Sequence, residues 1–99
     1  DVFGDGTVVI KSAPGHTPGH QVIYLRLPRT GDVLLSGDVY HFPESRTLRR
    51  VPTFDFDQEQ TPVTREAIEA FLASTGAQLW IQHDALGNAA LKKSPLYYD

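Results

Sequence analysis

Cysteine is absent from this sequence of 99 residues, which excludes disulfide bonds and zinc sites built from thiolates. Long apolar runs are absent too, and none approaches the roughly 20 residues that a membrane-spanning helix needs. Basic residues are few: the one cluster, Arg46, Arg49 and Arg50, lies beside Glu44, and the formal net charge is -3. Neither a nucleic-acid partner nor a membrane partner is therefore expected. Any metal ion must be bound by histidine and carboxylate.

The composition that is present is typical of a folded globular chain. Apolar residues make up 40% of the sequence and charged residues 21%, which is ordinary for a domain and unlike a disordered segment. A chain of this length forms one domain or part of one. The sequence contains no repeat and no low-complexity segment, and it leaves the compartment open.

The predicted elements alternate in the manner of an α/β fold. β-branched and aromatic residues favour strands in several places, and one apolar run has the character of a strand covered on both faces. These strands are predicted over residues 7–11, 21–27, 33–36 (the covered one) and 78–82.

A helix is predicted from Thr61 to Gly76, because Thr61 can cap the free amides and Pro62 suits the first helical position. A weaker helix is predicted over 85–93, where Gly and Asn lower the helix propensity. Between the strands and the long helix, residues 39–60 show no clear period. They are predicted to be a long ordered loop that works as a lid or a binding segment.

The heptapeptide PGHTPGH at 14–20 is the most constrained stretch of the chain. Its prolines fix φ, and its glycines allow conformations that are closed to other residues. His16 is thereby held in place by covalent geometry before any packing is considered. Such rigidity suits a metal ligand.

Three predicted strands end in a group that can bind a metal ion: His16, Asp38 and His83. These residues are far apart in the sequence, so only the fold can bring them together. Strands that arrive at one edge of a sheet gather their terminal residues there. Two imidazoles and one carboxylate suit zinc, with manganese, iron or cobalt as alternatives that depend on geometry.

Taken together, these motifs resemble the later metal-binding motifs of the metallo-β-lactamase superfamily. They are PGHTPGH at 14–20, LSGD at 35–38 and IQHD at 81–84, in the superfamily's order, and the likeness covers essentially the whole chain. GDVY at 37–40 and the closing QHD look most like the N-acyl homoserine lactonase branch. The resemblance implies half of an αββα sandwich, a mixed sheet flanked by helices, in a hydrolase that opens lactones or esters.

The resemblance also implies roles for particular residues. His16 would bind one zinc ion, His83 would bind a second, and Asp38 would bridge the two and orient the nucleophile. A metal-bound hydroxide would then attack the substrate carbonyl. In the lactonase branch a tyrosine three residues after the bridging aspartate holds that carbonyl. Here Tyr40 follows Asp38 by two residues and His41 by three, so each of them could donate to the developing oxyanion or could simply pack.

Two further residues are expected to support the site without binding metal. His20 begins a strand, and a structural hydrogen bond to a ligand is favoured over ligation. Asp84 could orient an imidazole or cap the following helix, and capping is favoured. Three phenylalanines of the long loop could line an acyl-chain pocket or anchor the loop: Phe42, Phe54 and Phe56.

The superfamily's first metal motif, H-x-H-x-D-H, is missing from this sequence. Only four histidines are present, at positions 16, 20, 41 and 83. Residues 1–99 are therefore expected to be the C-terminal portion of the domain, inactive alone, with apolar strand faces that need the N-terminal half or a second copy of the chain. The open alternatives are a glyoxalase-II-like thioesterase, a β-lactamase of the same fold, and a non-catalytic half-domain that binds metal or mediates association.

Overall fold

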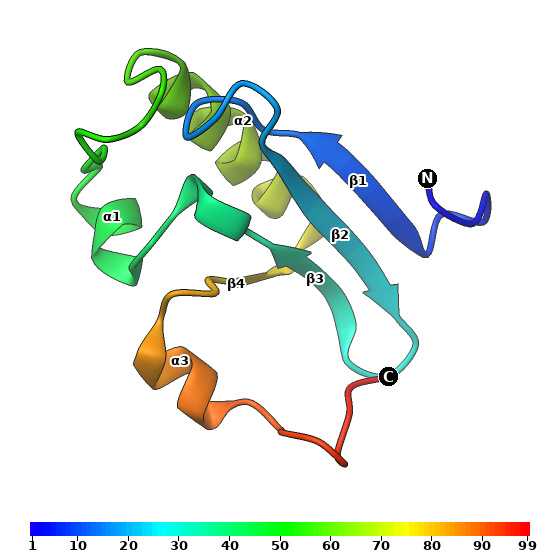
Figure 1. Ribbon diagram of the computed structural model, residues 1–99. Coiled ribbons are helices and arrows are strands. Elements are labelled where there is room, and N and C mark those ends of the chain that lie inside the picture. The colour runs from blue at the N-terminus through cyan, green and yellow to red at the C-terminus, as the bar shows by residue number, and fades with distance from the viewer.

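The computed structural model describes all 99 residues and contains one mixed sheet (Figure 1). The strands β1 (Val8–Ser12), β2 (Gln21–Leu27) and β3 (Gly31–Leu35) form an antiparallel meander. The strand β4 (Gln78–Trp80) lies beside β3 and runs parallel to it. The four strands lie at the predicted places, within a few residues of the predicted ends.

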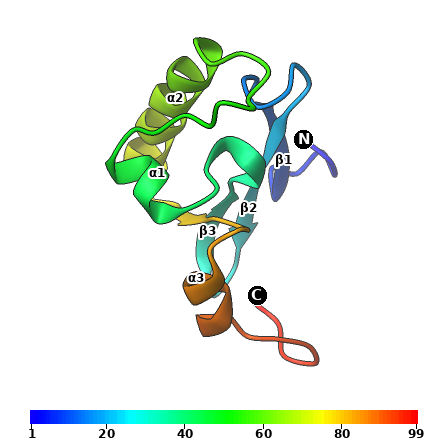
Figure 2. The ribbon, with the colours of Figure 1, turned by 60° about the vertical axis from the view of Figure 1, so that its left-hand side comes forward.

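One long helix, α2 (Gln60–Thr75), covers one face of this sheet (Figure 2). Gly76 ends the helix in the left-handed conformation, with φ of 69°, as the sequence predicts. Three shorter helical elements also occur: η1 (Gly37–Val39), α1 (Pro43–Thr47) and α3 (Ala85–Ala90). None of these helices is long and apolar enough to span a membrane.

The core lies between α2 and the sheet. Val22 and Leu34 point from the strands toward Ile68 and Leu72 of α2, and all four side chains are buried. Leu34 and its neighbour Val33 are both fully shielded from solvent. Burial of two consecutive residues confirms that β3 is covered on both faces.

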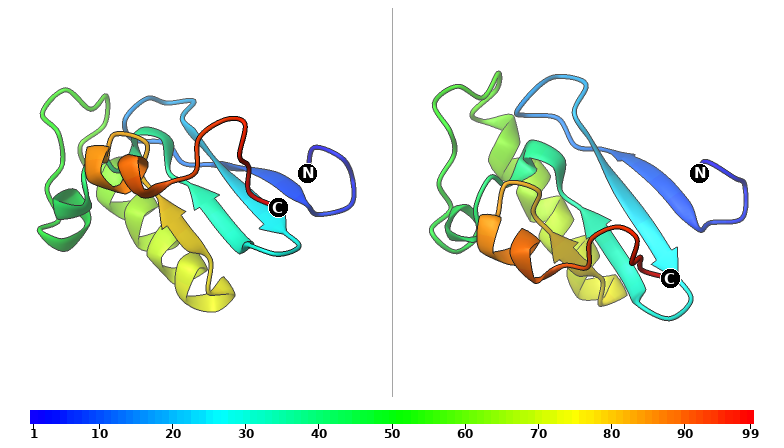
Figure 3. Two further views of the ribbon diagram at one scale, coloured as in Figure 1. Left: turned by 90° about the horizontal axis from the view of Figure 1, so that it is seen from below. Right: turned by 60° about the horizontal axis from the view of Figure 1, so that its bottom comes forward.

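The other face of the sheet is only partly covered. The C-terminal segment returns beside the turn between β2 and β3, where the amide of Arg29 donates to the carbonyl of Asp99 at 2.9 Å (Figures 1 and 3). Tyr98 packs edge-on against Trp80, with ring centroids 4.9 Å apart. Ile10 and Ile23 remain open on β1 and β2.

Two local predictions are wrong. Residues 39–60 are not free of regular structure, because α1 forms within them; its five residues are too few to give a periodic pattern. Thr61 does not cap α2 either. The carboxylate of Asp57 accepts from the amides of Glu59 at 3.0 Å and Gln60 at 2.9 Å, so an aspartate two residues before Glu59 satisfies the first free amides.

Candidate metal centre

The PGHTPGH loop joins β1 to β2 and is fastened to the start of α2. Gly15 has φ of 143°, and a Cβ atom at this position would lie 2.4 Å from Oγ1 and 2.8 Å from Cα of Thr61. The hydroxyl of Thr64 donates to the carbonyl of Pro14 at 2.6 Å. Only glycine permits this contact between loop and helix, and the contact fixes the backbone that carries His16.

The His16 ring is oriented by a buried carboxylate. Nδ1 of His16 lies 2.9 Å from Oδ1 of Asp55, whose side chain is fully buried. The other oxygen of Asp55 accepts from the hydroxyl of Thr61 at 2.8 Å. Because a carboxylate can only accept, Nδ1 carries the ring proton, and the lone pair of Nε2 is left free for a metal ion.

Asp38 lies in η1, immediately after β3, and its backbone is held by His20. The amide of Asp38 donates to Nε2 of His20 at 2.8 Å, and Nδ1 of His20 donates to the carbonyl of Ala13 at 3.0 Å. Gly37 has φ of 54°, and a Cβ atom there would lie 2.7 Å from the His20 ring. His20 is thus a hydrogen-bonding partner of the Asp38 backbone, with both ring nitrogens engaged.

The two carboxylate oxygens of Asp38 face two different imidazoles. Oδ1 lies 2.7 Å from Nε2 of His83, and Oδ2 lies 3.2 Å from Nε2 of His16. Burial raises the pKa of Asp38, but the hydrogen bond with His83 and the nearby imidazole charges outweigh it, so the pKa of Asp38 lies below its usual value. The structure therefore brings together the three residues that ended predicted strands, and Asp38 is an anion near neutral pH.

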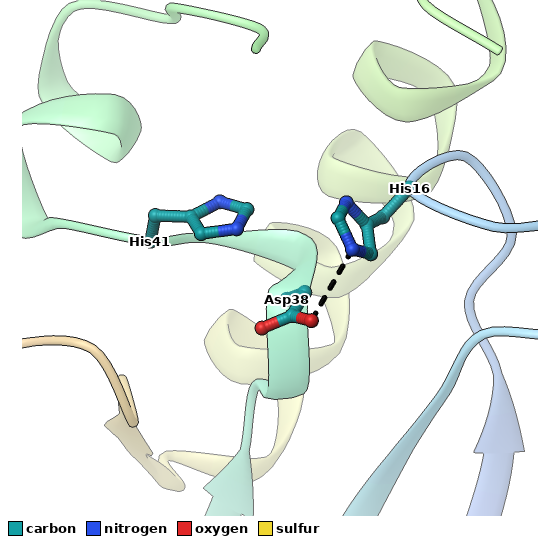
Figure 4. A group of neighbouring side chains, drawn as sticks. All are labelled: His16, Asp38 and His41. Atoms are coloured by element: carbon teal, nitrogen blue, oxygen red, sulfur yellow. Dashed lines mark ion pairs between the residues drawn. The ribbon is translucent and has the colours of Figure 1, made fainter. Parts of the chain in front are cut away.

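His41 also reaches this cluster. One ligand atom each from His16, Asp38 and His41 lie within 4.8 Å of one another, and the His41 ring points toward the other two side chains (Figure 4). The ring stacks on His83 with centroids 5.0 Å apart, and its Nδ1 is buried without a hydrogen-bond partner. Burial lowers the pKa of His41, which keeps the ring neutral and able to bind metal at neutral pH.

Tyr40 is not brought to the cluster. Its side chain is buried and its hydroxyl donates to the carboxylate of Glu69 at 2.8 Å. Burial, together with that hydrogen bond, raises the pKa of Tyr40. Tyr40 therefore packs in the core, which was one of its two expected roles. The backbone that leaves η1 turns residue 40 toward α2 and residue 41 toward Asp38. The Tyr40 hydroxyl thus faces Glu69 and lies outside the cluster, and its place as a catalytic donor stays a prediction.

Asp84 takes the position before α3, but its carboxylate makes no capping hydrogen bond and none to an imidazole. Neither of its two expected functions is therefore seen as a side-chain contact.

The three phenylalanines of the long loop differ in what they contact. All three side chains are exposed, but Phe54 packs edge-on against His16 at 5.9 Å and His41 at 5.5 Å.

Asp55 is the residue that the sequence analysis missed. It lies 39 positions from His16, in a stretch without periodicity, and no local motif marks it. The one available signal was its place in an Asp-rich segment just before the start of the long helix. Such a segment more often caps a helix, as Asp57 does here.

The assembled donors fit a hard-to-borderline divalent cation. Imidazole nitrogens and carboxylate oxygens are ligands that zinc accepts. One imidazole has its second nitrogen on a buried carboxylate, which is the usual arrangement around a metal-binding histidine. His16 and Asp38 on one side, and Asp38 and His83 on the other, could each hold part of the coordination shell of one ion.

Comparison with known sequences finds relatives along the whole chain, although no protein-family model matches it. The sequence is 34% identical over 99 residues to N-acyl homoserine lactonase AttM of Azorhizobium caulinodans. It is 32% identical over 98 residues to N-acyl homoserine lactonase AttM of Rhizobium johnstonii. The alignments include 100% and 99% of this chain but only 38% and 37% of those relatives. The chain thus spans well under half of their length.

Comparison with solved structures gives the same result for the fold. An N-acyl homoserine lactone hydrolase with the product N-hexanoyl-L-homoserine at its catalytic metal centre aligns with a TM-score of 0.85 at 24% identity, over 97% of this chain and 38% of that one. The dizinc quorum-quenching lactonase AidC aligns with a TM-score of 0.67 at 22% identity, over 82% and 28%. These likenesses confirm the fold class that the sequence predicts.

Proposed function

We propose, on the premise that this chain has part of the metallo-β-lactamase fold and is homologous along its whole length to N-acyl homoserine lactonases, that the protein hydrolyses the ring ester of N-acyl homoserine lactones. We further propose that residues 1–99 supply the C-terminal portion of the domain, since they align with only 38% of the first relative. The remaining metal ligands, of the H-x-H-x-D-H type, would come from an N-terminal portion.

One observation carries the proposal: each oxygen of Asp38 faces a separate imidazole, His83 at 2.7 Å and His16 at 3.2 Å. A carboxylate shared in this way suits two adjacent cations. Two zinc ions bound there would polarise the lactone carbonyl and activate water at neutral pH. Manganese, iron or cobalt could occupy the same donors.

The residues of this chain would hold and orient that centre. Asp38, kept ionised by its surroundings, would bridge the two ions. His16 and His83 would bind one ion each through Nε2, and Asp55 would keep the His16 ring at the required angle. His20 would fix the backbone of Asp38. All of these contacts exist before substrate arrives, so little reorganisation is needed in the reaction.

The similarities favour a lactone over the substrates of the alternative hydrolases. Both curated relatives named above are lactonases, and this supports the lactonase over the thioesterase or β-lactamase alternative. The non-catalytic half-domain is less well supported, because the polar cluster is built with an oriented imidazole and a bridging carboxylate, which a purely structural surface does not need.

The test measures hydrolysis of an N-acyl homoserine lactone, by acid release at constant pH, and the zinc content. It uses purified protein that carries the N-terminal portion together with residues 1–99, because residues 1–99 alone are expected to be inactive. We expect about two zinc ions per site and loss of turnover on chelation. Asp38→Asn should lower the zinc content. It should also lower the turnover rate by about 100-fold or more. Asp32→Asn, at the other end of β3, is the matched control. Turnover of a glutathione thioester or a β-lactam in place of the lactone would contradict the proposal.

A further inference from the structure

We propose that His41 is a metal ligand, and that with His16 and Asp38 it forms a three-residue set for the ion on the His16 side. The inference rests on the proposed function and deepens it, because it assigns one more residue of this chain to the metal centre. The position three residues after Asp38 would then contribute to metal binding and not to contact with the substrate carbonyl.

The geometry of the three side chains supports this assignment. Nε2 of His16 and Oδ2 of Asp38 are 3.2 Å apart, which is close to the separation of about 3.3 Å between two ligands of a tetrahedral zinc ion with bonds near 2.0 Å. A ring nitrogen of His41 completes a triangle with sides of at most 4.8 Å (Figure 4).

The ring nitrogens of His41 take part in no hydrogen bond within the structure. His41 makes no hydrogen bond, and its Nδ1 is buried without a partner. The ring is instead held by other rings: it stacks on His83 at 5.0 Å and meets His16 edge-on at 5.4 Å. The ring is therefore well positioned, but its buried Nδ1 is left without a hydrogen-bond partner, which costs free energy that a bound cation would offset.

Three imidazoles around one carboxylate are an arrangement that a cation explains. His16, His41 and His83 surround Asp38, and neutral rings in this position present lone pairs to one another as well as to the carboxylate. A divalent ion on the His16 side would accept lone pairs of His16, His41 and Asp38, and His83 would face the second ion. If His41 instead donated a hydrogen bond to a substrate oxygen, the ion on the His16 side would have only two ligands from this chain, His16 and Asp38.

The test measures metal binding directly. The metal-free protein is titrated with Co²⁺, and the visible absorption spectrum and the dissociation constant are compared with those of His41→Phe, which keeps the ring packing but has no ligand atom. We expect a dissociation constant raised by about tenfold or more and a changed cobalt spectrum. His41→Asn provides a second, smaller variant with the same expected direction. Circular dichroism and the melting temperature verify folding.

Phe54→Leu is the control for packing, because it removes a ring that lies edge-on to His41 without removing a ligand. Its cobalt spectrum should be unchanged. If the His41 variants keep the cobalt affinity and spectrum but lose turnover, His41 acts on the substrate and the inference is overturned. If wild-type protein that carries the N-terminal portion as well binds no metal and opens no lactone, the proposed function fails together with the inference. Equal metal binding with and without His41, in an active lactonase, overturns the inference alone.

Discussion

At the scale of single residues, the buried contact between Asp55 and His16 determines which nitrogen of His16 can bind a metal ion. The Asp55 carboxylate is shielded from solvent, and both of its oxygens are used, one by His16 and the other by Thr61. A charge in this position persists only when it is fully hydrogen-bonded. The contact therefore serves both the fold of the loop and the orientation of the imidazole.

Asp55→Asn is expected to weaken zinc binding by about 10–100-fold, as loss of an orienting partner does in other metal sites. The amide can still accept at one atom, but its NH₂ group would face either the Thr61 hydroxyl or the His16 ring. Competition with a chelator of known affinity measures the change. Asp57→Asn, two residues further on, keeps its acceptor for the α2 amides and should leave zinc affinity unchanged. Equal affinity in both variants would show that His16 does not depend on Asp55.

Tyr40 and His41 show what a one-residue difference does at this scale. They are adjacent in sequence, yet the Tyr40 hydroxyl donates to Glu69 of α2, whereas the His41 ring stacks on His83. The sequence places both of them near Asp38 and cannot separate them. The direction in which the backbone leaves η1 is set by packing of Val39 and Tyr40 in the core, and this direction assigns each side chain.

At the scale of elements, the metal centre depends on the fit between the PGHTPGH loop and α2. Gly15 lies directly against the Thr61 backbone. The amides of Phe56 and Asp57 donate to the carbonyls of His16 and Gly15 at 3.0 and 2.9 Å. The segment before α2 therefore runs beside the loop and is bonded to it. Movement of the start of α2 would therefore also move His16, the expected metal ligand.

Gly15→Ala is expected to lower the free energy of unfolding by about 2–4 kcal/mol, since it adds a strained φ to a clash with backbone. Zinc affinity should fall as well, because the loop that carries His16 must move. Gly19→Ala is a matched control in the same loop: Gly19 has no positive φ and no atom within 4 Å of an added Cβ. Chemical denaturation of both variants makes the comparison. Equal stability of the two would contradict the tight contact with Thr61.

At the scale of the whole molecule, the sheet has one well-covered face and one that is partly open. Ile10 and Ile23 are opposite each other in the β1–β2 register and are 45% and 37% exposed. Strand residues alternate between faces, so both lie on the side away from α2. Neighbouring exposed apolar side chains of this kind favour association. The sandwich architecture that the family resemblance implies would cover them with a second sheet.

Residues 1–99 produced alone are therefore expected to associate through this face, with a mass above the 11.0 kDa of one chain. The double variant Ile10→Lys with Ile23→Lys should shift sedimentation toward the single-chain mass, because burying two ammonium groups is costly. Val63→Lys is the control, since Val63 is 60% exposed on α2, on the other side of the sheet. A folded wild-type chain that sediments as a monomer would contradict the expectation.

The fold could be predicted largely from local patterns. The strands and α2 follow from apolar spacing, and Gly76 marks the helix end because few other residues adopt its φ of 69°. The short α1 could not be predicted, since its five residues contain no complete apolar repeat. The capping residue of α2 was misassigned because the hydroxyl of Thr61, a good capping residue, instead bonds to the carboxylate of Asp55, six residues earlier.

The sequence by itself determined where the strands and the long helix lie along the chain and the chemical types of donor available: imidazole and carboxylate, without thiolate. These depend on side-chain character and on spacing along the chain, which are local properties. Only the tertiary structure decided that Asp38 lies between His16 and His83, that His41 and not Tyr40 joins them, and that Asp55 orients His16. Contacts across 39 or 45 positions depend on how the core packs, and packing is a property of the whole chain.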